Sequence, residues 1–229
     1  ITGIPAANTG GTYAITVTAT DSANVPVTGS ASFTLTVAAD LYTSISNGPY
    51  TATYGTPTAS LATITPSGGI YPYTFTLATS VGVAPTGLVV SNTGVVSVGV
   101  ATNVPAGTYH VTVSVADSTS GTPLQGSVTF DVVVGLALSN STINNTVVAT
   151  NAGTITTVSA TGNTGTVTYA LSGTPPNWVT IDANSGVLSV SSSSIAGPQS
   201  VTVVATDGTT PGNATAAGTA STTISFTIQ

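Results

Sequence analysis

Few side chains in this sequence can act as acids, bases or charged ligands. The 229 residues include six Asp and one His but no Glu, Lys, Arg or Cys. Three carboxylates hold equivalent places: Asp21, Asp117 and Asp207 end the similar stretches GTYAITVTATD, GTYHVTVSVAD and QSVTVVATD. An Asp after a strand accepts hydrogen bonds from the N–H groups of the next turn. Calcium needs about six to eight oxygen ligands, several of them carboxylates. We therefore expect turn capping here, and no metal site or other cofactor.

The remaining ionisable residues do not form a catalytic pattern. Asp131 and Asp182 have no second acid nearby in the sequence, whereas a glycosidase needs a pair of carboxylates. His110 stands between Tyr109 and Val111, and strand alternation directs it outward. No G-x-S-x-G motif supports a nucleophilic serine. We predict that the protein is not an enzyme.

The composition excludes several partners. Without Lys or Arg the chain cannot neutralise phosphates, which argues against nucleic-acid binding. No apolar run is long enough for a membrane span, so we expect no membrane insertion. The fold must depend on apolar packing and backbone ladders, since disulfides and Lys or Arg salt bridges are absent. With so few titrating groups, we expect stability to be nearly constant from neutral to strongly acid pH.

The three similar stretches indicate a repeat. The aspartates are about 96 and 90 residues apart, roughly the length of an immunoglobulin-like sandwich. Stepping back by twos from each Asp gives apolar columns: Ala19, Val115 and Ala205; Val17, Val113 and Val203; Ile15, Val111 and Val201. Period two with one apolar face is typical of a strand on a two-layer core. The sequence predicts an all-β protein of tandem immunoglobulin-like, Greek-key sandwiches.

Further segments can be matched between copies of the repeat. The last strand of each copy is expected at 33–37, 130–134 and 224–228, and an earlier strand at 73–77 and 167–171. The stretches PTGLVVSNTGVVSV and PNWVTIDANSGVLSV each read as strand, turn and strand. Gly94 and Gly186 supply the turn residue that such a hairpin needs.

These motifs resemble the Putative Ig and cadherin-like repeat domains of bacterial and archaeal cell-surface proteins. The resemblance covers nearly the whole chain and implies an extracellular, repetitive, non-catalytic module. In cadherin-like modules the Asp of the repeated strand is a calcium ligand, and Asp40 could pair with Asp21 or Asp117. The other acidic motifs of that site are missing here, since SSSSIAG follows SGVLSV.

We expect complete sandwiches at 39–135 and 136–229, preceded by a partial unit at 1–38. The partial unit matches only the second half of the repeat, and a lone hairpin cannot cover its own apolar face. Either the sequence is cut from a longer repeat array, or the segment is completed by another chain through strand donation. In the second case the inter-subunit contacts would be Ile15, Val17, Phe33 and Leu35.

The aromatic residues have structural interpretations. Tyr13 and Tyr109 open the repeated strand, where a corner tyrosine bonds nearby backbone. The third copy has Gln199 instead, so we expect its corner to differ. We assign Trp178 to the core or an interface between units. A last group, Tyr42, Tyr50 and Tyr54, is expected at the interface of the second unit with the first.

The leading hypothesis is a structural subunit of an extracellular filament or cell-surface stalk. Its partners would be copies of itself or adjacent repeats, and the junctions VAADLY and VVVGLA are too short for flexible linkers. The alternative is an adhesin or carbohydrate-binding module of a larger surface protein. Glycans are also expected as attached groups, with sequons at Asn140, Asn144 and Asn213.

Overall fold

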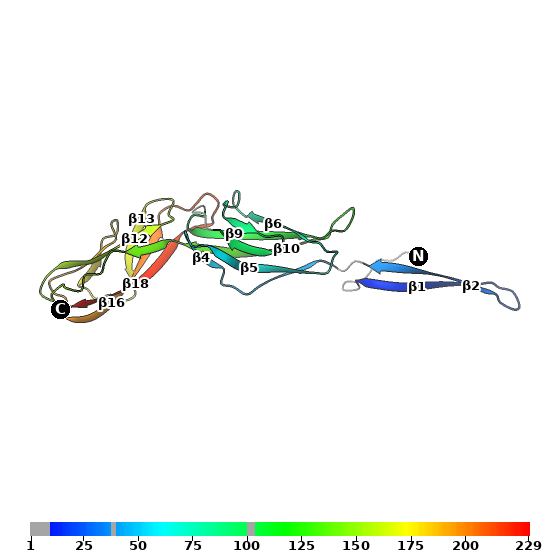
Figure 1. Ribbon diagram of the computed structural model, residues 1–229, viewed down its shortest axis with the longest axis horizontal. Coiled ribbons are helices and arrows are strands. Elements are labelled where there is room, and N and C mark those ends of the chain that lie inside the picture. The colour runs from blue at the N-terminus through cyan, green and yellow to red at the C-terminus, as the bar shows by residue number, and fades with distance from the viewer. Residues whose placement is uncertain (1–9, 38–39, 100–103) are drawn as a thin grey trace.

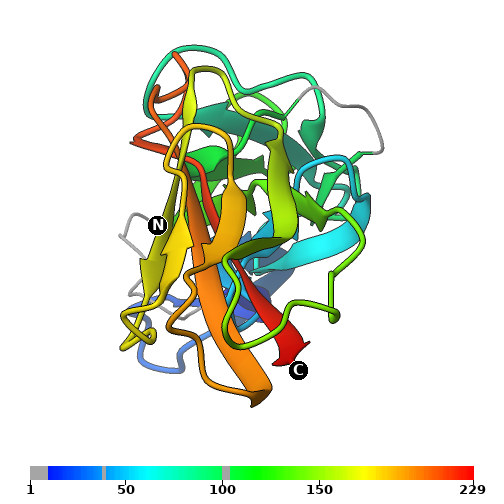
Figure 2. The ribbon, with the colours of Figure 1, turned by 90° about the vertical axis from the view of Figure 1, so that its left-hand side faces the viewer.

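The computed structural model describes residues 10–37, 40–99 and 104–229, and all its regular elements in these ranges are β-strands. Figure 1 shows an elongated arrangement: the hairpin β1–β2 lies at one end, followed by two β-sandwiches. Figure 2 views the chain from the end of the second sandwich and shows its two layers of strands. The all-β, tandem-sandwich architecture expected from the repeat is confirmed.

The first sandwich contains the strands β3 to β10. One sheet has the order β3-β5-β8-β7, and the other joins β6, β9, β10 and β4. With the strands lettered A, A′, B, C, D, E, F and G in chain order, these sheets are A-B-E-D and C-F-G-A′, the immunoglobulin arrangement. The strands are β3 (Tyr42–Ile45), β4 (Thr51–Thr53), β5 (Thr58–Ser67), β6 (Thr74–Thr79), β7 (Leu88–Val90), β8 (Val95–Val98), β9 (Gly107–Ala116) and β10 (Gln125–Gly135).

The second sandwich repeats this order. Its sheets are β11-β12-β15-β14 and β13-β16-β18, again A-B-E-D and C-F-G. The strands are β11 (Ala137–Asn140), β12 (Gly153–Thr161), β13 (Val167–Ser172), β14 (Val179–Ile181), β15 (Val187–Val190), β16 (Gly197–Asp207) and β18 (Thr219–Ile228). The short β17 (Ala216–Ala217) leaves this sandwich and pairs with the start of β9, so one backbone ladder crosses from one sandwich to the other.

Each sandwich has its own apolar core, built from the alternate residues of its strands. In β9 the residues Tyr109, Val111, Val113 and Val115 are fully buried, while the residues between them lie toward solvent. In β16, Val201, Val203 and Ala205 match the three valines and are also buried. Alternation in the sequence is therefore the direct cause of the two-layer packing.

Glycine shapes the turn between β7 and β8 and its counterpart between β14 and β15. Gly94 has a φ of 80° and Gly186 a φ of 68°, which side-chain-bearing residues rarely adopt. A Cβ atom would also lie 2.4 Å from the Ile64 carbonyl oxygen at the first position and 2.1 Å from that of Val158 at the second. The turns predicted from the sequence are confirmed.

The N-terminal hairpin consists of β1 (Gly11–Thr20) and β2 (Thr28–Val37), paired antiparallel over their whole length. Its register equals that of the F and G strands in both sandwiches. Ile15 is opposite Phe33, as Val111 is opposite Phe130 and Val201 is opposite Ile224. The hairpin thus has the register of an F–G pair.

Candidate assembly surface on the N-terminal hairpin

One face of the hairpin is apolar and open. Ile15, Val17, Phe33 and Leu35 share this face because the paired positions are all odd-numbered, and the other face carries Thr, Ser and Ala. Val17, Phe33 and Leu35 are 45%, 46% and 44% exposed, whereas Val113, Phe130 and Val132 at the same places in the first sandwich are 0%, 8% and 0% exposed. The four residues predicted as inter-subunit contacts therefore lie together on one uncovered surface.

The hairpin also lacks the strands that flank its counterparts. In the first sandwich β9 pairs with β6 on its outer edge, and β10 pairs with the parallel strand β4. In the second sandwich β16 pairs with β13. Within the described ranges, β1 and β2 pair only with each other. Compared with the two sandwiches, the described residues place no C strand at the edge of β1, no A′ strand at the edge of β2, and no A-B-E-D sheet over the apolar face.

The aspartate after each F strand organises more than its own turn. Asp117 is only 4% exposed. Its Oδ1 accepts hydrogen bonds from the backbone N–H groups of Thr119 (3.1 Å) and Leu124 (2.7 Å). Its Oδ2 accepts from the Thr119 hydroxyl (2.6 Å) and from the N–H of Ile70 (2.9 Å), in the loop that leads into the C strand β6. Asp117 thus ties the F–G turn to the incoming C strand.

These bonds set the protonation behaviour of Asp117. Burial alone would raise its pKa, but the hydrogen bonds from Thr119, Ile70 and Leu124 outweigh it and lower the pKa from 3.8 to about 2. All of the bonds favour the ionised form. The carboxylate oxygens are already occupied by N–H and O–H donors, an arrangement that suits turn capping and competes with a cation.

Asp207 makes the same connection in the second sandwich. Its Oδ1 accepts from the N–H groups of Gly165 (2.9 Å) and Thr209 (3.1 Å), and its Oδ2 from the N–H and hydroxyl of Thr164. Burial opposes these bonds, yet the pKa of Asp207 is still lowered. The capping role predicted for this residue is confirmed, and the sequence did not reveal the link to the C strand.

Asp21 makes only half of these contacts. Its Oδ1 accepts from the N–H groups of Ala23 (3.3 Å) and Val27 (2.9 Å), the same two turn bonds that Asp117 receives. In the part of the chain that the structure describes, Oδ2 of Asp21 receives no hydrogen bond. The empty position is the one that Ile70 fills on Asp117.

The corner at the start of the F strand is built by different side chains in the two sandwiches. The Tyr109 hydroxyl donates to the carbonyl oxygen of Pro105 (2.6 Å), and burial raises its pKa to about 12. Gln199 donates through Nε2 to the carbonyl of Ile195 (3.4 Å), at the same spacing in the chain. The tyrosine corner is confirmed for Tyr109, and an amide takes the place of the hydroxyl in the second sandwich. Tyr13 opens β1 and is 41% exposed.

Two acidic residues have partners that the sequence analysis did not identify. Asp131 lies directly across the ladder from His110, and its Oδ1 is 2.6 Å from Nδ1 of the imidazole. Both side chains are solvent-exposed, as predicted for His110. Aligning β9 with β10 from the Val111–Phe130 match would have revealed this pair. Asp182 caps its own turn through bonds from the N–H and hydroxyl of Ser185 and the N–H of Asn184, and these bonds lower its pKa.

The aromatic residues near the start of the first sandwich do not form one interface group. Tyr50 packs edge-on against Phe130, with ring centroids 4.9 Å apart, inside the first sandwich. Tyr54 packs over Gly162 of the second sandwich. A Cβ atom added to Gly162 would lie 2.3 Å from Cγ of Tyr54. The expectation that Tyr54 faces the first unit is therefore wrong, because β4 runs toward the opposite end. Trp178 is buried in the second core, as expected.

The three sequons differ in their surroundings. Asn140 and Asn144 are exposed at the end of β11 and in the loop after it. Asn213 is partly buried at the junction of the sandwiches, and its Nδ2 donates to the carbonyl of Val83 (3.2 Å). Glycosylation stays a prediction at all three, and the available space favours Asn140 and Asn144.

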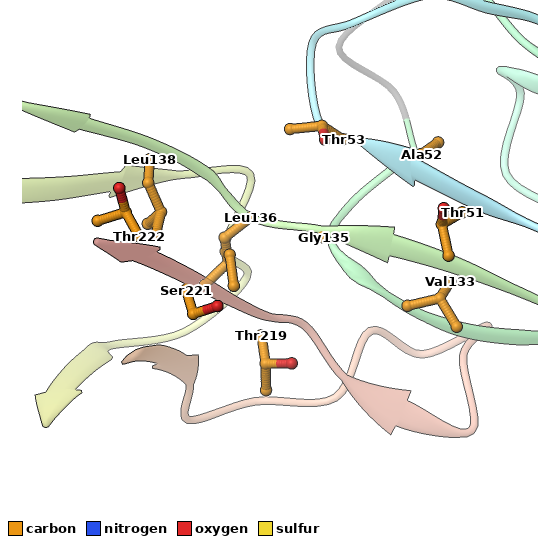
Figure 3. Close-up of a pocket in the computed structure, with 11 residues that line it drawn as sticks. Thr51, Ala52, Thr53, Val133, Gly135, Leu136, Leu138, Thr219, Ser221 and Thr222 are labelled. Atoms are coloured by element: carbon orange, nitrogen blue, oxygen red, sulfur yellow. The ribbon is translucent and has the colours of Figure 1, made fainter. Parts of the chain in front are cut away.

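A pocket lies where the two sandwiches meet (Figure 3). It is lined by residues of β4, β10, β11 and β18, chiefly Thr, Ser, Val, Ala and Leu. None of its lining residues is titratable, so the pocket offers no acid, base or nucleophilic pair. Elsewhere in the described ranges, no three His, Cys, Asp or Glu side chains are grouped as they would be around a metal ion. Across the same ranges there is no helix of the length and apolarity that crossing a membrane requires.

The family follows from a match to residues 1–38 and 39–135, which together make up more than half of the chain; the matching description reads "Putative Ig domain". The chain belongs to the Putative Ig domain family. The match includes the segment of the N-terminal hairpin, in agreement with its F–G register. A comparison with curated proteins finds no match.

Solved structures similar to this Putative Ig protein include cadherin and protocadherin domains. "Protocadherin gammaB7 EC3-6 cis-dimer structure" is 15% identical with a TM-score of 0.34, covering 96% of this chain and 59% of that one. Mouse cadherin-23 EC22-24 is 16% identical with a TM-score of 0.35, covering 93% of this chain and 73% of that one. Mouse protocadherin-24 EC1-3 is 17% identical with a TM-score of 0.34, covering 95% and 80%.

Proposed function

We propose that this protein is a structural, non-catalytic part of an extracellular filament or cell-surface stalk, joined to other copies through β-strand complementation at its N-terminal hairpin. The observation that carries the proposal is the open apolar face of β1–β2. The residues at its positions are buried in both complete sandwiches. An exposed, contiguous apolar face of this kind marks an interaction site.

The junction between the sandwiches supports a stiff, load-bearing role. Besides the ladder between β17 and β9, the N–H of Ala106 donates to the Gly162 carbonyl (2.9 Å) and that of Thr215 to the Thr108 carbonyl (2.7 Å). Ala106 of the first sandwich packs into the core of the second. The two sandwiches therefore form a continuous rod segment rather than beads on a flexible tether.

The proposal is tested by matched substitutions on the two faces of one strand. Val17→Asp places a charge on the apolar face, while Thr18→Asp places the same charge on the polar face. Electron microscopy and sedimentation of the full chain at rising concentration should show polymers for the unmodified chain and for Thr18→Asp, and monomers for Val17→Asp. Polymers that tolerate Val17→Asp, or an unmodified chain that stays monomeric at high concentration, would contradict the proposed function.

A second candidate function is adhesion or carbohydrate binding. It is favoured by Tyr71, which is 80% exposed and packs edge-on to Tyr73 with ring centroids 6.0 Å apart. A tyrosine ring offers an apolar face together with a polar hydroxyl, a combination found at many interfaces. Glycan binding that disappears in Tyr71→Ala, with assembly unchanged, would support this function.

A further inference from the structure

We propose that the outer edge of β1 binds one antiparallel strand of a second chain, and that this strand presents an aromatic residue to Ala19 and a leucine to Val17. The proposal deepens the proposed function and rests on it. It names the partner by the pattern its strand must carry.

The pattern comes from the two C strands that are already in place. In β6, Phe75 is opposite Val115 and Leu77 is opposite Val113. In β13, Tyr169 is opposite Ala205 and Leu171 is opposite Val203. Both strands therefore place an aromatic residue and then a leucine against the same two columns of the F strand.

Those columns continue into the hairpin at Ala19 and Val17. The F–G register is identical in the three copies, so a C strand can be placed on β1 without choosing an offset. A shift by one residue would turn the aromatic residue and the leucine to the polar face, where Thr and Ser lie. The apolar face thus fixes the register of the incoming strand.

Asp21 supplies a second, independent constraint on that register. Ile70 and Thr164, which donate their N–H groups to Oδ2 of Asp117 and Asp207, both stand five positions before the aromatic residue of their C strand. In the incoming strand, the residue five positions before the aromatic residue opposite Ala19 would donate its backbone N–H to Oδ2 of Asp21. This is the carboxylate oxygen that receives no bond within the described residues.

Neither β6 nor β13 is free to fill this edge, because they are already paired with β9 and β16. In keeping with the proposed function, we assign the incoming strand to a second chain. Recognition depends on backbone bonds and apolar contacts. Asp21 is the only charged residue between positions 10 and 37, so the partner needs no complementary charge. Binding through uncharged groups is expected to depend little on salt.

The register can be read with cysteine pairs, because the chain has no cysteine of its own. The segment 69–80, which carries β6 and the loop before it, is appended ahead of residue 1 of the full chain through a flexible Gly/Ser linker. Tethering raises its effective concentration to about millimolar. Thr18→Cys is combined with a cysteine at position 74, 76 or 78 of the appended copy.

Position 76 should form the disulfide several-fold faster than positions 74 and 78. Thr76 is opposite Ser114, which aligns with Thr18. The two alternatives are displaced along the strand by about 7 Å, which is too far for a disulfide at rest. Equal rates at all three positions, or no disulfide at any of them, would overturn the proposed register.

Asp21→Asn tests the second constraint. Losing the ionised acceptor for a backbone N–H should lower the occupancy of the tethered strand about tenfold, measured by hydrogen exchange of the β1 amides. Asp40→Asn makes the same charge change at an exposed site outside the hairpin and should have no effect. If both substitutions lower the occupancy of the tethered strand equally, Asp21 does not bind the incoming strand.

The outcomes separate this inference from the proposed function. The Thr18→Cys chain is also examined without the appended segment. If two such chains form a disulfide with each other, two hairpins pair directly. That result would refute the incoming C strand while leaving a polymer in place. Filaments that tolerate Val17→Asp would refute the polymer interface itself.

Discussion

The central expectation is that one substitution has very different costs at equivalent positions of the repeat. Val17, Val113 and Val203 occupy the same column of the F strand, but Val113 and Val203 are 0% exposed and Val17 is 45% exposed. Replacement by threonine keeps the shape of the side chain and exchanges a methyl group for a hydroxyl. The cost of each change therefore reports whether that copy of the strand is covered.

The magnitude follows from the burial. At Val113 or Val203 the change removes about 0.8 kcal/mol of apolar burial and places a hydroxyl in a core, which costs about 1–3 kcal/mol when it finds no partner. We expect a loss of roughly 2–4 kcal/mol and a fall in Tm of about 10–30 °C for the affected sandwich. At Val17 the hydroxyl stays hydrated, and the change should lie within about 0.5 kcal/mol.

The assay is calorimetry and urea unfolding of the dilute, monomeric chain, followed by sedimentation at high concentration. Val17→Thr should leave both unfolding transitions in place and weaken assembly, because the partner strand then meets a polar group. A loss of stability in the monomer equal to that of Val113→Thr would mean that the hairpin face is already covered in a solitary chain. The hairpin face would then be closed in the monomer and could not be the assembly surface.

Three further outcomes are expected. Because the pKa of Asp117 is lowered to about 2 in the folded state, its contribution is complete above about pH 4 and is lost as the pH falls toward 2; urea titrations should show this decline, and Asp117→Asn should reduce it. Tyr109→Phe removes a buried hydrogen bond and should cost about 1 kcal/mol in urea unfolding, whereas Tyr71→Phe at an exposed site should cost nothing measurable. Gly162→Ala places a Cβ atom against Tyr54 at a φ of 96°, and small-angle scattering should show a bend at the junction.

The acid profile qualifies the expectation of constant stability drawn from the composition. Six carboxylates are few, but number alone does not set the linkage. Asp117 and Asp207 accept several hydrogen bonds each, and each bond lowers the pKa of its carboxyl group. Stability is expected to be flat only down to about pH 4, where protonation of these groups in the unfolded chain begins.

The strands of the repeat were predictable because their alternation is strong and occurs several times. Columns such as Val17, Val113 and Val203 need only a period of two and a common end point. The same columns predicted that residues 1–38 match the second half of the repeat. Sequence alone therefore identified the surface, and the structure added its exposure and register.

Contacts across the fold were not predictable in the same way. The link from Asp117 to Ile70 joins residues that are far apart in sequence, and no pattern in either segment marks it. The strand β17 has two residues, too few to show alternation, and Ala216 pairs with Thr108 of the other sandwich. Such contacts depend on how distant segments and neighbouring sandwiches pack together. Local sequence propensity carries no information about this packing.

The identical register of the three F–G pairs raises the question of what keeps β1–β2 out of the sites held by β9–β10 and β16–β18. The apolar columns are nearly interchangeable. The pair His110–Asp131 is particular to β9–β10, but both side chains are solvent-exposed and lie away from the core face. The F–G pair that fills each sandwich must then be selected by covalent connection. Because β9 belongs to the same chain as its A-to-E strands, its effective concentration at that site is higher than a separate hairpin can reach. Among the described residues the open F–G face is that of β1–β2, so under the proposed function we expect assembly to take place at the hairpin.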